Sequence, residues 1–143
     1  MKKIIIFLLI IVMFITGCNK QKTNNTITDI NEVKSMKIII DNKEYIINLE
    51  KNETVNNLIN LLPLELNMNE LNGNEKYVYL DKSLPTDSYK PGNIEVGDVM
   101  LYGNNCLVIF YKSFDTPYSY TKIGHIDNLP DLGNKNITVR IEL

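Results

Sequence analysis

Arginine and histidine are almost absent from this chain of 143 residues, which holds one of each, Arg140 and His125. Nucleic-acid-binding domains gather lysine and arginine on one face. The chain has 15 basic and 17 acidic residues. Without Lys2 and Lys3, which belong to an N-terminal leader described below, 13 basic residues remain and the net charge is −4. The sequence contains no basic patch, so we expect no nucleic-acid partner.

Cysteine is also scarce, and the motifs of the common enzyme families are missing. With Cys18 and Cys106 alone, no cysteine cluster can bind a metal ion, and lipidation of Cys18 would leave no disulfide. Cys106 opens the apolar run Cys-Leu-Val-Ile-Phe and is predicted to be a small buried residue. The chain has no Gly-rich phosphate loop, Gly-x-Ser-x-Gly motif, zinc spacing or dinucleotide fingerprint. We therefore expect neither a cofactor nor a metal.

Two polar groupings leave weaker alternatives open. His125 and Asp127 could act as a general base, but no nucleophile motif accompanies them, and a lone histidine is more often structural. The segment 127–132 offers oxygen ligands for Ca²⁺, although its spacing does not match an EF-hand loop. Its Asp, Asn and Pro residues, followed by Gly133, are typical of a turn, which is the interpretation that we favour.

The first 17 residues have the form of a secretory signal peptide. Two lysines precede the unbroken apolar run 4–15, which is shorter than the roughly 20 residues that a membrane-spanning helix needs. Residues 15–18, Ile-Thr-Gly-Cys, resemble a lipobox, in which small residues admit a peptidase and the cysteine thiol accepts a diacylglycerol. We expect Cys18 to anchor the protein to the extracytoplasmic face of the cell membrane. A plain signal peptide or an uncleaved anchor is the alternative.

The rest of the chain divides into a tether and one domain. Residues 18–35 are polar and show no sustained period, which predicts a flexible tether. Residues 36–143 have the size of one domain and can bury a core without disulfides. We expect this domain to be a monomer.

Short alternating or β-branched runs predict an all-β domain with one helix. The runs are 37–41, 44–49, 64–68, 76–80, 98–102, 106–111 and 137–143. The Asp-Asn-Lys segment between the first two predicts a hairpin with a tight turn. The helix is predicted from apolar residues at helical spacing, with Asn52 or Thr54 as the cap and Pro63 at the end: Val55, Leu58, Ile59 and Leu62. Runs 38–40 and 107–109 are apolar at every position, so both faces of these strands have to be covered. A closed barrel with a helix packed against it provides such cover.

Four segments resemble a family of bacterial cyclophilin-like domain proteins. They are 72–77 (Asn-Gly-Asn-Glu-Lys-Tyr), 96–99 (Val-Gly-Asp-Val), 107–112 (Leu-Val-Ile-Phe-Tyr-Lys) and 122–126 (Lys-Ile-Gly-His-Ile). The resemblance covers 36–143 and implies a closed cyclophilin-like β-barrel of about eight strands with one helix.

The resemblance also implies a groove on the outer face of the barrel, where true cyclophilins isomerise prolyl bonds. Their arginine, on an early strand, donates to the prolyl nitrogen. The corresponding segment 76–80 holds no arginine, and Arg140 lies on the last strand. No glutamine follows the turn at 103–105 either. We therefore expect a binding module for a peptide, protein or small ligand, with a weak or degenerate prolyl isomerase acting on exported proteins as the alternative.

Aromatic residues in the segment 110–120 are the candidates for ligand binding. Tyrosine and phenylalanine supply a large contact area with few rotors to immobilise. The candidate ligand-binding residues, with the nearby histidine included, are Phe110, Tyr111, Tyr118, Tyr120 and His125. The alternative is that Phe110 belongs to the core and that the tyrosines only cover the end of the barrel.

Membrane attachment is expected to depend on Cys18. The variant Cys18→Ser should lose incorporation of a labelled fatty-acid analogue in cells, because serine has no thiol to accept the diacylglycerol. Cys106→Ser is the matched control and should label like the wild type. Equal labelling of Cys18→Ser and wild type would contradict the lipobox.

Overall fold

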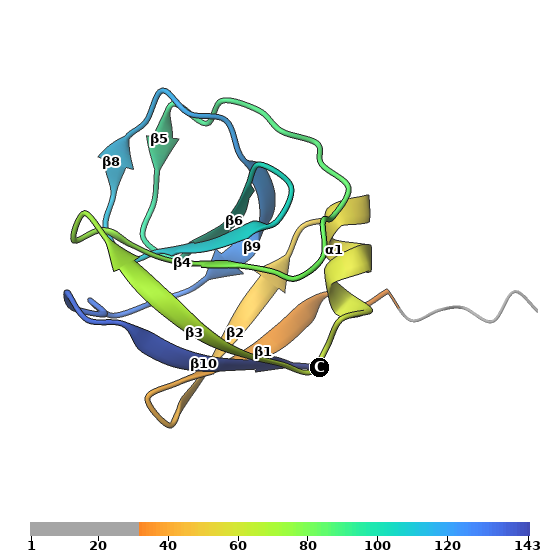
Figure 1. Cartoon of the computed structure of the whole chain (residues 1–143), viewed down its shortest axis with the longest axis horizontal. Helices are drawn as coiled ribbons and strands as arrows, with labels where there is room; N and C mark the ends of the chain where they lie inside the picture. Colours follow the sequence, from red (N-terminus) through yellow and green to blue (C-terminus); the bar gives the residue numbers. More distant parts are fainter. Residues whose placement is uncertain (1–31) are drawn as a thin grey trace, which may run out of the picture. The chain divides into compact units, whose positions relative to one another are not determined.

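A closed antiparallel barrel of eight strands forms the body of the protein (Figure 1). The computed structural model describes residues 32–143. In chain order the barrel strands are β1 (Ser35–Ile40), β2 (Lys43–Leu49), β3 (Leu64–Leu71), β4 (Glu75–Tyr79), β6 (Asp98–Tyr102), β7 (Cys106–Phe110), β9 (Thr121–Ile126) and β10 (Ile137–Glu142). Around the barrel they follow the order β1-β10-β3-β4-β7-β6-β9-β2. The predicted all-β fold with a closed barrel of about eight strands is confirmed.

The hairpin between β1 and β2 turns through two residues that favour such turns. Asp41 and Asn42 both have positive φ angles, 48° and 63°. Asparagine and aspartate tolerate this region, and two such residues match the right-handed twist of the flanking strands. The turn fixes the register in which Ile40 pairs with Lys43. The Asp-Asn-Lys segment that separates the two apolar runs therefore does form the predicted tight turn.

Helix α1 (Glu53–Ile59) is the helix predicted from the apolar stripe. The Asn52 side chain caps it by accepting a hydrogen bond from the Val55 N–H at 2.9 Å, and the Asn52 amide donates to the carbonyl oxygen of Lys122 on β9 at 2.8 Å. Val55 and Leu58 join the cluster that fills the barrel. Within 32–143 the structure contains no helix of the length and hydropathy required to cross a membrane.

The barrel interior is filled by alternate residues of each strand. On β10, Ile137, Val139 and Ile141 are buried, whereas Thr138 and Arg140 are exposed. This is the alternation expected of a strand with one face on the core and one face in water. The same rule leaves Ile39 only half buried between Ile38 and Ile40 of β1.

Strand β7 departs from this pattern because both of its faces are covered. Leu107 and Ile109 lie in the barrel interior. Cys106, Val108 and Phe110 form a second buried cluster outside the barrel, together with residues of the neighbouring strands and loops. The expectation that the helix covers the outer face of 107–109 is wrong.

That cover comes from a small separate sheet. Strand β5 (Asn93–Ile94) pairs with β8 (Phe114–Asp115), and the two stand apart from the barrel in Figure 1. The long connections that carry them are joined once more, where Tyr89 and Tyr120 exchange backbone hydrogen bonds of 2.9 and 3.0 Å. Ile94 and Tyr120 belong to the buried cluster on β7. Neither short strand gave a periodic signal in the sequence.

A buried lysine links β4 to the loop that precedes β10. Lys76 is fully buried, and its amine donates to the backbone carbonyls of Gly133 and Lys135, the second at 2.7 Å. The same amine lies 4.7 Å from the centre of the Tyr111 ring. Burial lowers the pKa of Lys76. The amine is thus surrounded by oxygen atoms and an aromatic face, the surroundings that a buried cation needs.

Replacing Lys76 is expected to destabilise the fold. The variant Lys76→Met keeps the chain length but loses both hydrogen bonds to the carbonyls, and we expect the free energy of unfolding to fall by about 2 kcal/mol. Urea denaturation measures this change. Lys135→Met is the matched control, because the Lys135 side chain is 67% exposed and only its carbonyl takes part. Equal unfolding midpoints for Lys76→Met and Lys135→Met would contradict the role assigned to the amine.

Candidate functional site

A cleft of about 350 Å³ opens on the outer face of the barrel, beside strands β4, β7 and β6. Its volume lies within the usual range for small-ligand sites. Half of its lining residues are aromatic, and the others are small, aliphatic or polar. They are Leu71, Asn72, Asn74, Glu75, Tyr77, Tyr79, Tyr102, Cys106, Val108, Phe114, Tyr118 and Tyr120.

One wall of the cleft is the outward face of β4. Alternation along the strand places Glu75, Tyr77 and Tyr79 on the face opposite to Lys76. Tyr77 pairs with Val108 of β7, and Tyr79 pairs with Cys106. The Tyr77 and Tyr79 rings are 6.0 Å apart and nearly perpendicular, at 82°.

The opposite wall combines the end of β6 with the connection that follows β8. The rings of Tyr102 and Tyr118 lie 6.1 Å apart at 79°, and those of Tyr102 and Tyr120 lie 5.6 Å apart. Tyr120 is buried, and this burial raises its pKa. Tyr118 and Tyr79 are 58% and 64% exposed, so solvent reaches the aromatic groups from the mouth of the cleft.

Two residues that line the cleft carry an acceptor group without a protein partner in the described part of the chain. No hydrogen bond or ion pair joins the half-buried carboxylate of Glu75 to another side chain of the described part of the chain. Burial raises the pKa of Glu75, and the nearby charge of Glu70 raises it further. The Oδ1 atom of Asn74 is buried without a hydrogen-bond partner. Such an unsatisfied acceptor is unusual in a folded protein and calls for an explanation.

Cys106 contributes a thiol to the floor of the cleft. The residue is buried, as predicted from its apolar run. Burial raises the pKa of the thiol to about 11, with a further contribution from the charge of Glu75. Near neutral pH the thiol therefore stays protonated, and it behaves as a small apolar group.

The predicted ligand-binding residues are placed in three different environments. Tyr118 and Tyr120 line the cleft, and Phe110 lies buried beside them, with its ring centre 5.6 Å from that of Tyr120. Tyr111 belongs to the barrel-core cluster, and its hydroxyl donates to Glu70 at 3.1 Å. His125 lies on β9, outside the lining of the cleft.

His125 is held between two carboxylates. Its Nδ1 atom is 3.1 Å from Asp98 Oδ1, and its Nε2 atom is 3.8 Å from Asp127 Oδ1. Asp98 also accepts a hydrogen bond from the Glu95 N–H at 3.0 Å, which ties the imidazole to the turn before β6. In the region that the structure describes, no three histidine, cysteine, aspartate or glutamate side chains converge as a metal ion would require.

Sequence reasoning missed much of the cleft: Glu75, Tyr77, Tyr79 and Tyr102. The alternation of Glu75, Tyr77 and Tyr79 was a usable signal that these residues share one face of a strand. The pairing of β4 with β7, which brings that face beside the aromatic segment, joins residues about thirty positions apart and left no local signal.

Comparison with known proteins gives a family and one similar structure. A model of the cyclophilin-like family matches residues 38–142. The solution structure of a hypothetical protein from Archaeoglobus fulgidus is similar at 21% sequence identity, over 76% of this chain and 93% of that chain, with a TM-score of 0.49. No curated protein matches the chain. The family match covers most of the chain and coincides with the closed barrel, so the protein belongs to the cyclophilin-like family.

Proposed function

We propose that the protein is a binding module whose aromatic cleft holds a peptide, a protein segment or a small ligand. The observation that carries this proposal is the lining of the cleft, which gathers five tyrosines and Phe114 around about 350 Å³. Removing apolar surface from water contributes about 25 cal/mol per Å². Tyrosine also offers a hydroxyl at the rim, which suits a site that is apolar at its base and wet at its mouth.

The proposed module binds its ligand without isomerising a prolyl bond. The barrier to rotation about a peptide bond is about 18–20 kcal/mol, and an enzyme lowers it through contacts that are stronger in the twisted state. An arginine donor would provide such a contact. Arg140 instead lies on β10 and forms ion pairs of 2.7 Å with Glu65 and Glu142. The charged side chain in the lining described here is Glu75, which cannot donate a hydrogen bond when ionised.

We further propose that the module works at the extracytoplasmic face of the cell membrane. The support is the signal-like start and the Ile-Thr-Gly-Cys pattern ending at Cys18. The signal peptide, Cys18 and most of the tether fall in 1–31, outside the described residues. The first barrel strand begins at Ser35, which leaves the segment 18–34 between the lipid and the barrel.

Ligand binding is expected to weaken when exposed tyrosines of the cleft are truncated. A library of short peptides and small fragments is screened by NMR, and hits are located by the amide shifts that they cause. For hits in the cleft, Tyr79→Ala and Tyr118→Ala should each raise the dissociation constant about fivefold, the effect of losing roughly 1 kcal/mol of aromatic contact.

Tyr89→Ala is the matched control for these variants. Tyr89 is 44% exposed but does not line the cleft, and alanine keeps the backbone hydrogen bonds to Tyr120. This variant should bind like the wild type. A screen without a single hit among the amides of β4, β6 and β7 would refute the binding function.

Prolyl isomerisation provides a separate test. The cis–trans relaxation of a proline-containing peptide, followed with and without the protein, is expected to proceed at the uncatalysed rate, because no arginine faces the cleft. A true cyclophilin run in parallel shows that the assay detects catalysis. A clear acceleration by the wild type that Tyr118→Ala reduces would favour the isomerase alternative.

A further inference from the structure

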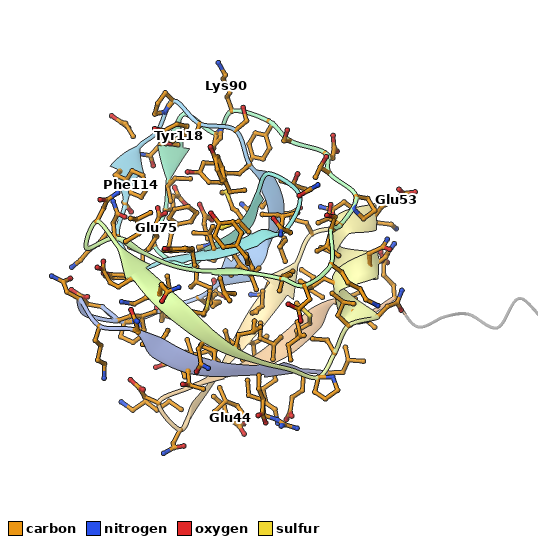
Figure 2. All side chains as sticks on the ribbon, in the orientation of Figure 1. Glu44, Glu53, Glu75, Lys90, Phe114 and Tyr118 are labelled. Carbon is orange, nitrogen blue, oxygen red and sulfur yellow. The ribbon has the colours of Figure 1, made fainter. Side chains whose placement is uncertain are left out.

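The cleft has a marked charge pattern. Its described lining contains one carboxylate, Glu75, and no lysine, arginine or histidine. Figure 2 shows Glu75 on the same side of the molecule as Phe114 and Tyr118, whereas Glu44 and Glu53 lie elsewhere on the surface. A site lined in this way is complementary to a positively charged ligand.

The carboxylate of Glu75 is not compensated by the protein. Its sequence neighbour Lys76 points to the other face of β4, where the carbonyls of Gly133 and Lys135 accept from its amine. The charge that acts on Glu75 is that of Glu70, which is of like sign. A half-buried carboxylate without a partner loses part of its solvation and gains no ion pair in return. A bound cation would supply the missing partner.

The aromatic rings strengthen this complementarity. Two pairs of rings, Tyr77 with Tyr79 and Tyr102 with Tyr118, meet at 82° and 79° and belong to opposite walls. The face of an aromatic ring is negative and attracts ammonium groups, and six aromatic residues line this cleft.

We propose that the cleft binds an organic cation, an alkylammonium group whose charge lies near Glu75 and whose methylene or methyl groups contact the tyrosines. This inference rests on the proposed binding function and specifies the chemical class of the ligand. The group can belong to a free small molecule or to the lysine side chain of a peptide, since both present the same chemistry.

Matched pairs of probes separate charge from shape. The first pair is choline and its neutral isostere, in which a tert-butyl group replaces the trimethylammonium group. The second pair is Nα-acetyl-lysine N-methylamide, whose side-chain amine is free, and the corresponding norleucine compound, which lacks that amine. Titration of the wild-type protein followed by NMR should show each cation that enters the cleft binding about tenfold more tightly than its neutral partner. Binding of choline alone supports a small-molecule ligand, and binding of the lysine compound supports a peptide.

Two variants test the assigned residues. Glu75→Gln keeps the shape of the side chain and should remove the preference for the cation, whereas Glu53→Gln, on the exposed first turn of α1, should keep it. Since the Glu75 carboxylate has no partner among the described residues, Glu75→Gln is expected to melt at or above the wild-type temperature. If that variant does not fold, Tyr79→Leu takes its place, because it removes an exposed ring face and keeps an apolar side chain.

Three results would overturn the inference. Equal affinity of the wild type for a cation and its neutral isostere would show that the cleft selects shape alone. A cation preference that survives Glu75→Gln would place the charge elsewhere. Binding of neither pair, with peptide or fragment hits still mapping to the cleft, would refute the cation and leave the binding function intact.

Discussion

Strand β7 imposes the constraint on which the rest of this structure depends. All five of its residues are buried, so the barrel alone, which covers one face of each strand, cannot satisfy it. The inward residues Leu107 and Ile109 pack in the barrel, and the outward residues need a second layer. The β5–β8 pair and the connections around it form that layer. The cleft is lined both by this layer, through Phe114, Tyr118 and Tyr120, and by the outward face of β4, through Tyr77 and Tyr79.

Because side chains alternate along β4, its adjacent charged residues Glu75 and Lys76 lie in different surroundings. Lys76 faces the barrel and is fully satisfied by two carbonyls and the Tyr111 ring, which is a structural arrangement. Glu75 faces outward into the cleft and has no such partners, although it is adjacent in sequence. A fully satisfied buried polar group specifies a single packing, whereas a partly buried one without a partner calls for an explanation, which a bound ligand would provide. Lys76 is therefore a structural residue, whereas Glu75 is a candidate for contact with a ligand in the cleft.

Local patterns in the sequence predicted much of the fold. The period of two in 137–143 and the Asp-Asn-Lys turn gave correct strands and a correct hairpin, because neighbouring residues decide both. The short strands β5 and β8 were missed, since two residues show no period and their pairing is set by the need to cover β7. The aromatic segment made Tyr118 and Tyr120 candidates, and both line the cleft, whereas Tyr77 and Tyr79 were not among the candidates. The latter join the cleft through a strand pairing that no local pattern reveals.

The barrel strands contribute to the cleft with the side that does not fill the barrel, and the connection after β8 contributes the rest of its aromatic lining. Tyr79, Tyr102 and Tyr118 are exposed, so substitutions there remove little of the packing that keeps the barrel closed. Such positions can change over evolutionary time under selection for a ligand, while the interior changes under selection for folding. The two pressures act on alternate residues of the same strands. Related barrels can therefore diverge in what they bind while their architecture stays the same.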